Sequence, residues 1–329
     1  MRPHKSLNEL ILKNCQLNDI EGIEELNLLQ SLNLSLNNFS FTEPIQLLWL
    51  LKKIKNLDIS GNPLFIKPEL IFPENIIVDL QDQKIEIINI SSTQLEDEQL
   101  EKLLAIYISN VDSIKQLNLS KNQLTDASMP YLKEYLISND ENLENEGKHL
   151  KLDISYNQLK DNYEYLIFNP KIKDLKLGGN EIVFSHKTID IASTSTLTHL
   201  DISNQSLKAQ SIQDFIRLAN YQSLTHLNFQ NLGLTQVSTN HLLKQILINN
   251  LRIEYINFSY NNVGWKGCKV LNLIIQRIKK LRILLLDYAN IQCVGLTYLW
   301  LALNDPNQED LVLEHLSVRQ NNINVQWAV

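Results

Sequence analysis

One pattern of apolar and polar positions returns along the whole chain at intervals of 22 to 35 residues. Most copies have apolar residues at their first, fourth, sixth and eleventh positions and a polar residue at the ninth, as in IKQLNLSKNQL (residues 114–124) and IEYINFSYNNV (residues 253–263). Apolar residues at alternate positions predict a short strand with one buried face. Because the pattern can be laid down twelve times, we expect an array of repeats that each add one strand.

The ninth position is the most regular polar site of the pattern. Its residues are Cys15, Asn37, Asn62, Thr93, Asn122, Asn157, Asn180, Gln205, Leu232, Asn261, Ala289 and Asn321. An asparagine there can hydrogen-bond the backbone of the neighbouring repeat, which predicts a ladder of such bonds along the array. Leu232 and Ala289 cannot form these bonds, so we expect the ladder to be interrupted at both.

Several segments between the strands have apolar residues at helical spacing. They are residues 95–110, 126–139, 211–220, 237–250, 265–280 and 293–304. The earliest repeats are shorter and predict extended or 3₁₀ connections. Residues 63–83 contain three prolines, which exclude a helix there, and residues 137–149 form an acidic loop insertion.

The pattern L-x-x-L-x-L-x-x-N-x-L resembles that of leucine-rich-repeat proteins over essentially the whole chain. The resemblance implies an α/β leucine-rich-repeat solenoid, a curved horseshoe with a parallel concave sheet and with helices and irregular turns on its convex side. It implies a single domain over residues 1–329 with about twelve repeats. Short repeats of the intracellular type are mixed with ribonuclease-inhibitor-like repeats.

The third, fifth and seventh positions of each copy are expected to point outward from the concave sheet. Most hold Asn, Asp or Ser, but the eleventh copy has Ile283 and Leu285 there. Tyr255 lies one copy away, and Tyr260 and Tyr288 follow at eighth positions. Leaving such side chains in water forgoes roughly 1.5–3 kcal/mol each, so the cluster indicates a contact surface. The alternative is drift near the end of the array or an error of register.

Three histidines share the third-position column. His199 and His226 lie on adjacent strands with Asp201 one step along, whereas His315 is three strands from His226, roughly 15 Å away. A closed metal site would therefore lack ligands. We expect polar contacts to a partner protein, with no metal, cofactor or catalytic group. The predicted partner-binding residues are Tyr255, Tyr260, Ile283, Leu285, Asp287, Tyr288, His199, His226, Asp201, His315 and Arg319.

Composition narrows the classes of partner and compartment. The net charge of −7 argues against nucleic acid or an anionic membrane as the main partner. The start of the chain lacks the apolar core of a signal peptide, and no apolar run is long enough to span a bilayer. Three scattered cysteines favour a reducing compartment. We therefore expect a cytoplasmic protein, possible secretion into a host cell being the alternative.

The predicted function is a non-enzymatic scaffold that binds another protein, of unknown identity, on its concave face. No nucleotide-binding loop, nucleophile elbow or metal signature is present, and because the repeats extend over nearly the whole sequence we expect no catalytic domain. One alternative is a bacterial effector delivered into host cytoplasm, or a regulator of a host enzyme such as a small GTPase that would use Arg252, Arg282 or Arg319. Another is a cytoskeletal or ciliary structural subunit.

Overall fold

The computed structural model of the chain describes residues 6–40, 44–64, 85–108, 114–138, 149–161, 163–183, 196–207, 223–306 and 311–324. The chain divides into two compact units, Met1–Leu166 and Ile167–Val329, and each is described by itself. The proline-containing segment, the acidic loop and the predicted helix over 211–220 lie almost entirely outside the described residues. That the chain forms a single domain stays a prediction.

Each repeat contributes one short strand, and the strands follow one another in chain order. The first unit holds β1 (Glu9–Ile11), β2 (Ser31–Asn33), β3 (Asn56–Asp58), β4 (Ile87–Asn89), β5 (Gln116–Asn118) and β6 (Leu150–Asp153). The second holds β7 (Ile172–Lys176), β8 (His199–Asp201), β9 (His226–Asn228), β10 (Tyr255–Asn257), β11 (Ile283–Leu285) and β12 (His315–Ser317). Neighbours within a unit pair in parallel, third position against third position, as the sequence pattern predicts.

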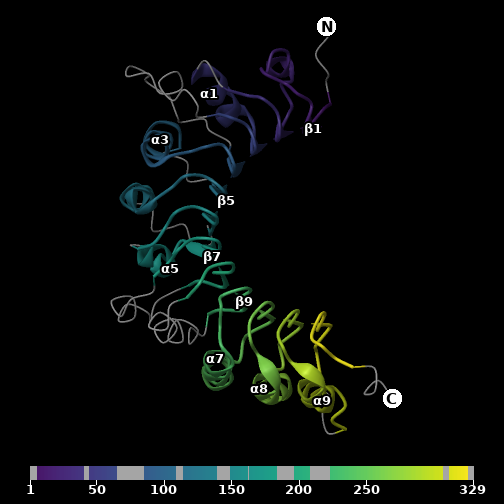
Figure 1. Cartoon of the computed structure of the whole chain (residues 1–329). Helices are drawn as coiled ribbons and strands as arrows, with labels where there is room; N and C mark the ends of the chain where they lie inside the picture. The colour runs from purple at the N-terminus through teal and green to yellow at the C-terminus, as the bar shows by residue number, and fades with distance from the viewer. Residues whose placement is uncertain are drawn as a thin grey trace. The chain divides into compact units, whose positions relative to one another are not determined.

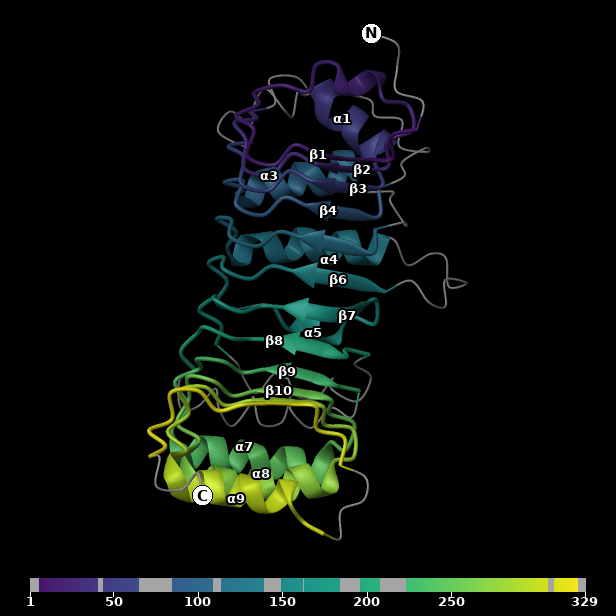
Figure 2. The same ribbon diagram turned by 90° about the vertical axis from the view of Figure 1, so that its right-hand side faces the viewer.

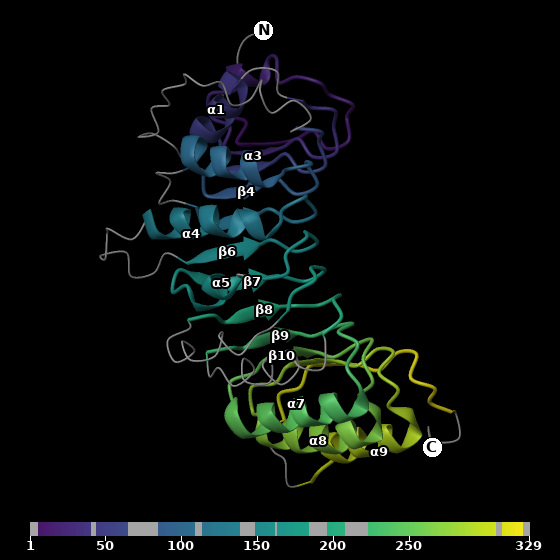
Figure 3. The ribbon, with the colours of Figure 1, turned by 60° about the vertical axis from the view of Figure 1, so that its left-hand side comes forward.

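Helices form many of the return connections (Figure 1). The first unit contains η1 (Ile23–Glu25), α1 (Pro44–Lys53), α3 (Asp97–Lys102), the π-helical turn η2 (Leu103–Tyr107), η3 (Asp126–Ser128) and α4 (Met129–Ser138). Helix α5 (Glu164–Phe168) spans the boundary, and the second unit contains α7 (Gln236–Asn249), α8 (Gly264–Arg277) and α9 (Gln292–Leu303). In each unit the strands lie on one side (Figure 2) and the helices on the other (Figure 3).

Helix α1 is absent from the sequence-based expectation, which assigned an extended or 3₁₀ return to the early repeats. Its sequence, PIQLLWLLKK, is apolar at almost every central position and so shows no helical period. Pro44 at the first helical position has the fixed φ that a helix start accepts. Buried Leu47, Leu50 and Leu51 hold the helix against the sheet.

The ninth-position asparagines form the predicted ladder. Asn122 is 8% exposed, and its Oδ1 accepts hydrogen bonds from the backbone N–H groups of Thr93 (2.9 Å) and Leu95 (3.2 Å). Its Nδ2 donates to the carbonyls of Ile90 and Leu119, both at 3.0 Å. One side chain thus satisfies three backbone groups of the preceding repeat and one of its own, in a turn that water does not reach.

At Leu232 and Ala289 the side-chain ladder is interrupted, as expected, and backbone carbonyls serve in its place. The Leu232 carbonyl accepts the N–H of Leu207 (3.3 Å). The Ala289 carbonyl accepts the N–H groups of Val263 (3.0 Å) and Gly264 (3.1 Å). Both apolar side chains are fully buried, so at these two repeats the ninth position becomes part of the core.

The eighth position has a left-handed backbone conformation in all twelve repeats, with φ between 52° and 70°. Only Gly61 and Gly179 are glycines among these residues; the others include Leu36, Lys121 and Tyr156. In most repeats the turn aims the eighth-position N–H at the next repeat, as when Leu36 donates to the Ser60 carbonyl at 2.8 Å. This conformation costs an L-residue with a bulky side chain about 1–2 kcal/mol, whereas Asn and Gly adopt it readily.

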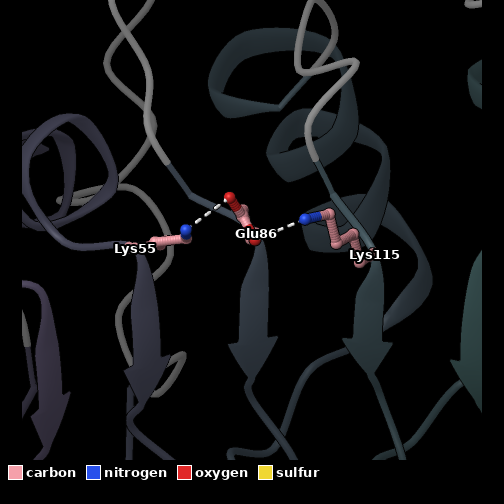
Figure 4. A network of polar contacts seen from close by, with 3 residues as sticks. All are labelled: Lys55, Glu86 and Lys115. Atoms are coloured by element: carbon pink, nitrogen blue, oxygen red, sulfur yellow. Dashed lines mark hydrogen bonds and ion pairs between the residues drawn. The ribbon is translucent and has the colours of Figure 1, made fainter. Parts of the chain in front are cut away.

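A small charged network lies at the start of three strands in the first unit (Figure 4). Glu86 Oε1 lies 2.9 Å from Lys55 Nζ, and its Oε2 lies 2.8 Å from Lys115 Nζ. The hydrogen bond from Lys115 and then that from Lys55 lower the pKa of the Glu86 carboxyl group. Because both lysines are well exposed, we expect the network to contribute little to stability.

The asparagine ladder predicts that Asn122→Ala strongly destabilises the protein. The substitution leaves buried backbone groups of two repeats without partners, so the free energy of unfolding should fall by about 3 kcal/mol, measured by urea denaturation. Asn118→Ala is the control, because its side chain accepts one bond, from the Ser120 N–H at 3.0 Å, and should cost about 1 kcal/mol. Equal losses in the two variants would contradict the ladder's role.

The eighth-position turn predicts that Leu36→Asn stabilises the first unit. Leu36 is 50% exposed with φ 58°, and asparagine relieves the backbone cost, giving a gain of about 0.5–1 kcal/mol in urea denaturation. Leu28 is 51% exposed but lies outside the left-handed region, so Leu28→Asn should give no such gain. A loss of stability at position 36 would show that the leucine side chain matters more than the turn.

Candidate functional site

The sequence-predicted partner-binding residues lie in the second unit, on strands β8 to β12 and the turns that follow them. Strand register aligns the third positions in one column: His199 pairs with His226, His226 with Tyr255, Tyr255 with Ile283, and Ile283 with His315. We call the strand side that carries these residues the open face. The opposite side of these strands packs toward helices α7 to α9.

Three rings of this column stack on one another, and we call them the aromatic ladder: His199, His226 and Tyr255. The imidazole centroids are 3.9 Å apart with planes at 17°, and the His226 and Tyr255 centroids are 5.8 Å apart at 15°. The Nδ1 atom of each histidine contacts the hydroxyl of the preceding threonine, Thr198 at 2.8 Å and Thr225 at 2.9 Å. Nε2 is therefore the ring nitrogen that remains for a partner.

The surroundings of His226 and Tyr255 in the aromatic ladder favour the uncharged form of each side chain. Burial, and secondarily the neighbouring His199, lowers the pKa of His226. Burial also raises the pKa of the Tyr255 phenol. The His226 imidazole and the Tyr255 phenol are therefore both neutral at pH 7, so these two rings of the aromatic ladder are flat and uncharged.

A shallow depression of about 200 Å³ opens beside the ladder. Its lining consists of Asp174, Lys176, His199, Leu200, Asp201, His226, Asn228 and Tyr255. Asp174 pairs in register with His199 from the adjacent strand β7. Asp174 was not among the predicted binding residues, although it belongs to the same third-position column, because an aspartate at that position does not depart from the repeat's polar pattern.

Most fifth-position residues have a structural role. The side-chain oxygen accepts the backbone N–H of the seventh residue in Asn33, Asp58, Asn89, Asn118, Asp153, Asp201, Asn228 and Asn257. Asp201 uses one oxygen for the Ser203 N–H (2.9 Å) and the other for Asn228 Nδ2 (2.8 Å). The Asp201 carboxylate thus joins its own turn to the end of the neighbouring strand β9.

Leu285 breaks this rule, and the neighbouring repeats compensate. The Asp287 N–H, which a fifth-position Asn or Asp would receive, donates instead to Ser259 Oγ of the preceding repeat at 3.1 Å. The Asp287 carboxylate in turn accepts the Arg319 N–H at 2.8 Å and the Ser317 hydroxyl. The Leu285 side chain therefore forms no hydrogen bond in the turn, whereas the Asp287 carboxylate is hydrogen-bonded to the next repeat. Ile283 and Leu285 are both half-buried on the open face.

Tyr260 and Tyr288 form a second stacked group, which we call the tyrosine pair. Their centroids are 4.7 Å apart with planes at 15°, they are 49% and 50% exposed, and both have left-handed backbones. The eighth position lies in the turn beyond the strand, five positions after the third. The aromatic residues of the predicted patch therefore form two stacked groups, the aromatic ladder and the tyrosine pair, and Leu285 ends strand β11 at the fifth position, between the third- and eighth-position columns.

The remaining predicted residues have differing surroundings. His315 and Arg319 are exposed at the last described strand and its turn. Arg282, a candidate for action on a partner enzyme, donates from Nε and Nη2 to the Glu314 carboxylate at 2.9 and 3.0 Å. Glu314 also raises the pKa of Arg282. Arg252 is exposed in the turn before β10.

The described part of the chain contains no group of three or more His, Cys, Asp or Glu side chains placed to hold a metal ion. Burial raises the pKa of the Cys268 thiol to about 12, so this cysteine is part of the core between helices α8 and α9. No helix within the described ranges has the length and apolar character needed to cross a membrane.

Comparison with known proteins gives a likeness of fold. No family model matches the chain, and no curated protein matches it in sequence. The crystal structure of an internalin from Listeria monocytogenes matches with a TM-score of 0.55 and 18% identity, covering 97% of this chain and 83% of the internalin. Internalin C2 from the same bacterium matches with a TM-score of 0.45 and 25% identity, covering 67% of this chain and 80% of that one. At 18% identity the first match shows the fold alone: the chain is a leucine-rich-repeat solenoid of twelve parallel strands with helices, as predicted.

Proposed function

We propose that this chain is a protein-binding repeat protein that recruits a partner on the open face of its second unit. The tyrosine pair is the observation that carries the proposal. Tyr260 and Tyr288 are half exposed in a conformation that costs a tyrosine about 1–2 kcal/mol each. The two preceding repeats have Asn204 and Asn231 at the same position, which avoid this cost.

Stacking of the two rings does not offset the backbone cost of having tyrosines at these two positions. A stacked aromatic pair contributes about 0.5–1.5 kcal/mol beyond burial, less than the summed backbone cost of the two residues. Burial against a partner would supply the missing stabilisation, because a tyrosine buries a large rigid surface and binds through its hydroxyl. Residues of this type are common among the few that dominate the affinity of protein interfaces.

Leu285 supports the same interpretation. It forgoes the hydrogen bond that eight other repeats form at the fifth position, and Ile283 lies beside it on the same strand. An apolar residue that gives no benefit to its own turn and lies between two aromatic groups is suited to contact with another protein. The partner surface would then extend from the aromatic ladder across Leu285 to the tyrosine pair.

We further propose a cytoplasmic setting, since all three cysteines are free. A role as a bacterial effector, as a regulator of a small GTPase or as a cytoskeletal subunit stays a prediction. No contact among the described residues favours one of these over the others, and Arg282, one of the three arginines proposed for a GTPase regulator, is already engaged by Glu314.

The proposal predicts that Tyr260→Asn/Leu285→Asn/Tyr288→Asn abolishes partner binding without unfolding the protein. Each substitution restores the residue that other repeats have at that position, so the urea midpoint should stay level or rise. Loss of such contacts should weaken binding at least about tenfold. The measurement is affinity capture from cell extract, followed by titration of the purified partner.

Tyr156→Asn is the matched control. Tyr156 is an eighth-position tyrosine that is 46% exposed with φ 54°, but it belongs to the first unit. Its replacement should leave binding unchanged. If the triple variant retains the partner, or if both variants lose it equally, the open face of the second unit is not the binding surface.

A further inference from the structure

The depression beside the aromatic ladder is rich in hydrogen-bond acceptors and poor in cations. Strands β8 to β10 and their flanking residues 198–203, 225–230 and 254–259 contain Asp201 and Glu254 but no lysine or arginine. Asp174 contributes a further carboxylate, and Lys176 is the one cationic side chain in the lining. The two carboxylates and the one lysine of the lining sum to a charge of −1, and Glu254 adds another negative charge nearby.

The arrangement of the rings limits what can bind. The rings of His199 and His226 are stacked, with centroids 3.9 Å apart and planes at 17°. A metal ion lies about 2.0–2.1 Å from a histidine nitrogen and close to the plane of its ring, so two rings stacked in this way are poorly placed to bind one ion together. The pair can instead face a flat group that stacks on a ring or donates hydrogen bonds at its edge.

We infer that this depression receives an arginine side chain of the bound protein. This inference rests on the proposed function and names the chemistry of one contact. A guanidinium group is planar, donates in a fork that matches the Asp174 carboxylate, and stacks on aromatic faces. A volume of about 200 Å³ accommodates one side chain of this size. Lysine lacks the flat face and offers a point charge only.

Acidification should weaken this contact. The charged and titratable groups that face His226 are His199 and Asp201 on β8, Asp174 and Lys176 on β7, and Glu254 and Tyr255 at β10. With its pKa lowered, His226 stays neutral at pH 7, and its protonation at lower pH adds positive charge beside the guanidinium.

The test uses the full chain with ¹³C-labelled histidine and a small probe, N-acetyl-arginine methylamide, at pH 7.5. N-acetyl-citrulline methylamide is the matched neutral probe, since citrulline has nearly the same shape without the charge. The NMR signals of His199 and His226 should shift with half-saturation at roughly 1–10 mM arginine probe. The exposed His315 of the same column is the internal control and should not respond.

Asp174→Asn should lower the affinity for the arginine probe about three- to fivefold, as expected for the loss of an accessible ion pair. The urea midpoint of this variant should be unchanged. Lowering the pH to about 5 should also lower the affinity for the arginine probe. An equal response to the citrulline probe, no response up to about 50 mM, or an unaltered response in Asp174→Asn would each overturn the inference.

Failure of this inference is distinguishable from failure of the proposed function. The Tyr260→Asn/Leu285→Asn/Tyr288→Asn variant should lose the protein partner but keep the response of His199 and His226 to the arginine probe. If the partner binds wild type normally while the probe fails, only the arginine site is wrong. If the probe binds while the triple variant retains its partner, only the wider surface is wrong.

Discussion

The end of each strand imposes the constraint on which the rest of this structure depends. There the chain turns away from the sheet inside a packed array, and its N–H and C=O groups still need partners. The ninth-position asparagine bonds backbone groups of two successive repeats, as Asn122 does, while the eighth residue turns into the left-handed region to reach the next repeat. Both devices work across repeats, so each repeat depends on its neighbour for its hydrogen bonds.

Where this constraint is met in another way, side chains become available for other roles. At the ninth position, the side chains of Leu232 and Ala289 can pack in the core because their backbone carbonyls accept the hydrogen bonds instead. Leu285 gives up its turn bond because Ser259 accepts the N–H of Asp287 instead. Exchanges of this kind concentrate in the second unit, where the exposed aromatic residues also gather. A repeat whose turn does not need the fifth-position hydrogen bond can have an apolar residue at that position on its open face.

The open face of the second unit combines three kinds of contact in a small area. The tyrosine pair offers large half-exposed rings, Leu285 offers apolar surface, and the aromatic ladder lies beside carboxylates at a shallow depression. Apolar anchors give affinity, whereas the charged depression would select among partners. Burial lowers the pKa of His226, so the imidazole beside this depression is neutral at pH 7.

The strands, their register, the helices α3, α4, α7, α8 and α9, and the asparagine ladder with its two interruptions could all be predicted from the sequence. These features depend on period-two and period-3.6 patterns and on one side chain per repeat, which are local properties. Helix α1, the left-handed eighth position, the structural roles of Asp201 and Asp287, and the arrangement of the predicted aromatic residues in two stacked groups became visible only in the folded chain. A hydrogen bond between repeats joins residues 25 to 32 positions apart in the examples of Asn37 with Asn62 and of Arg319 with Asp287, so its partner, and whether a side chain is left free, appear only when the repeats stack.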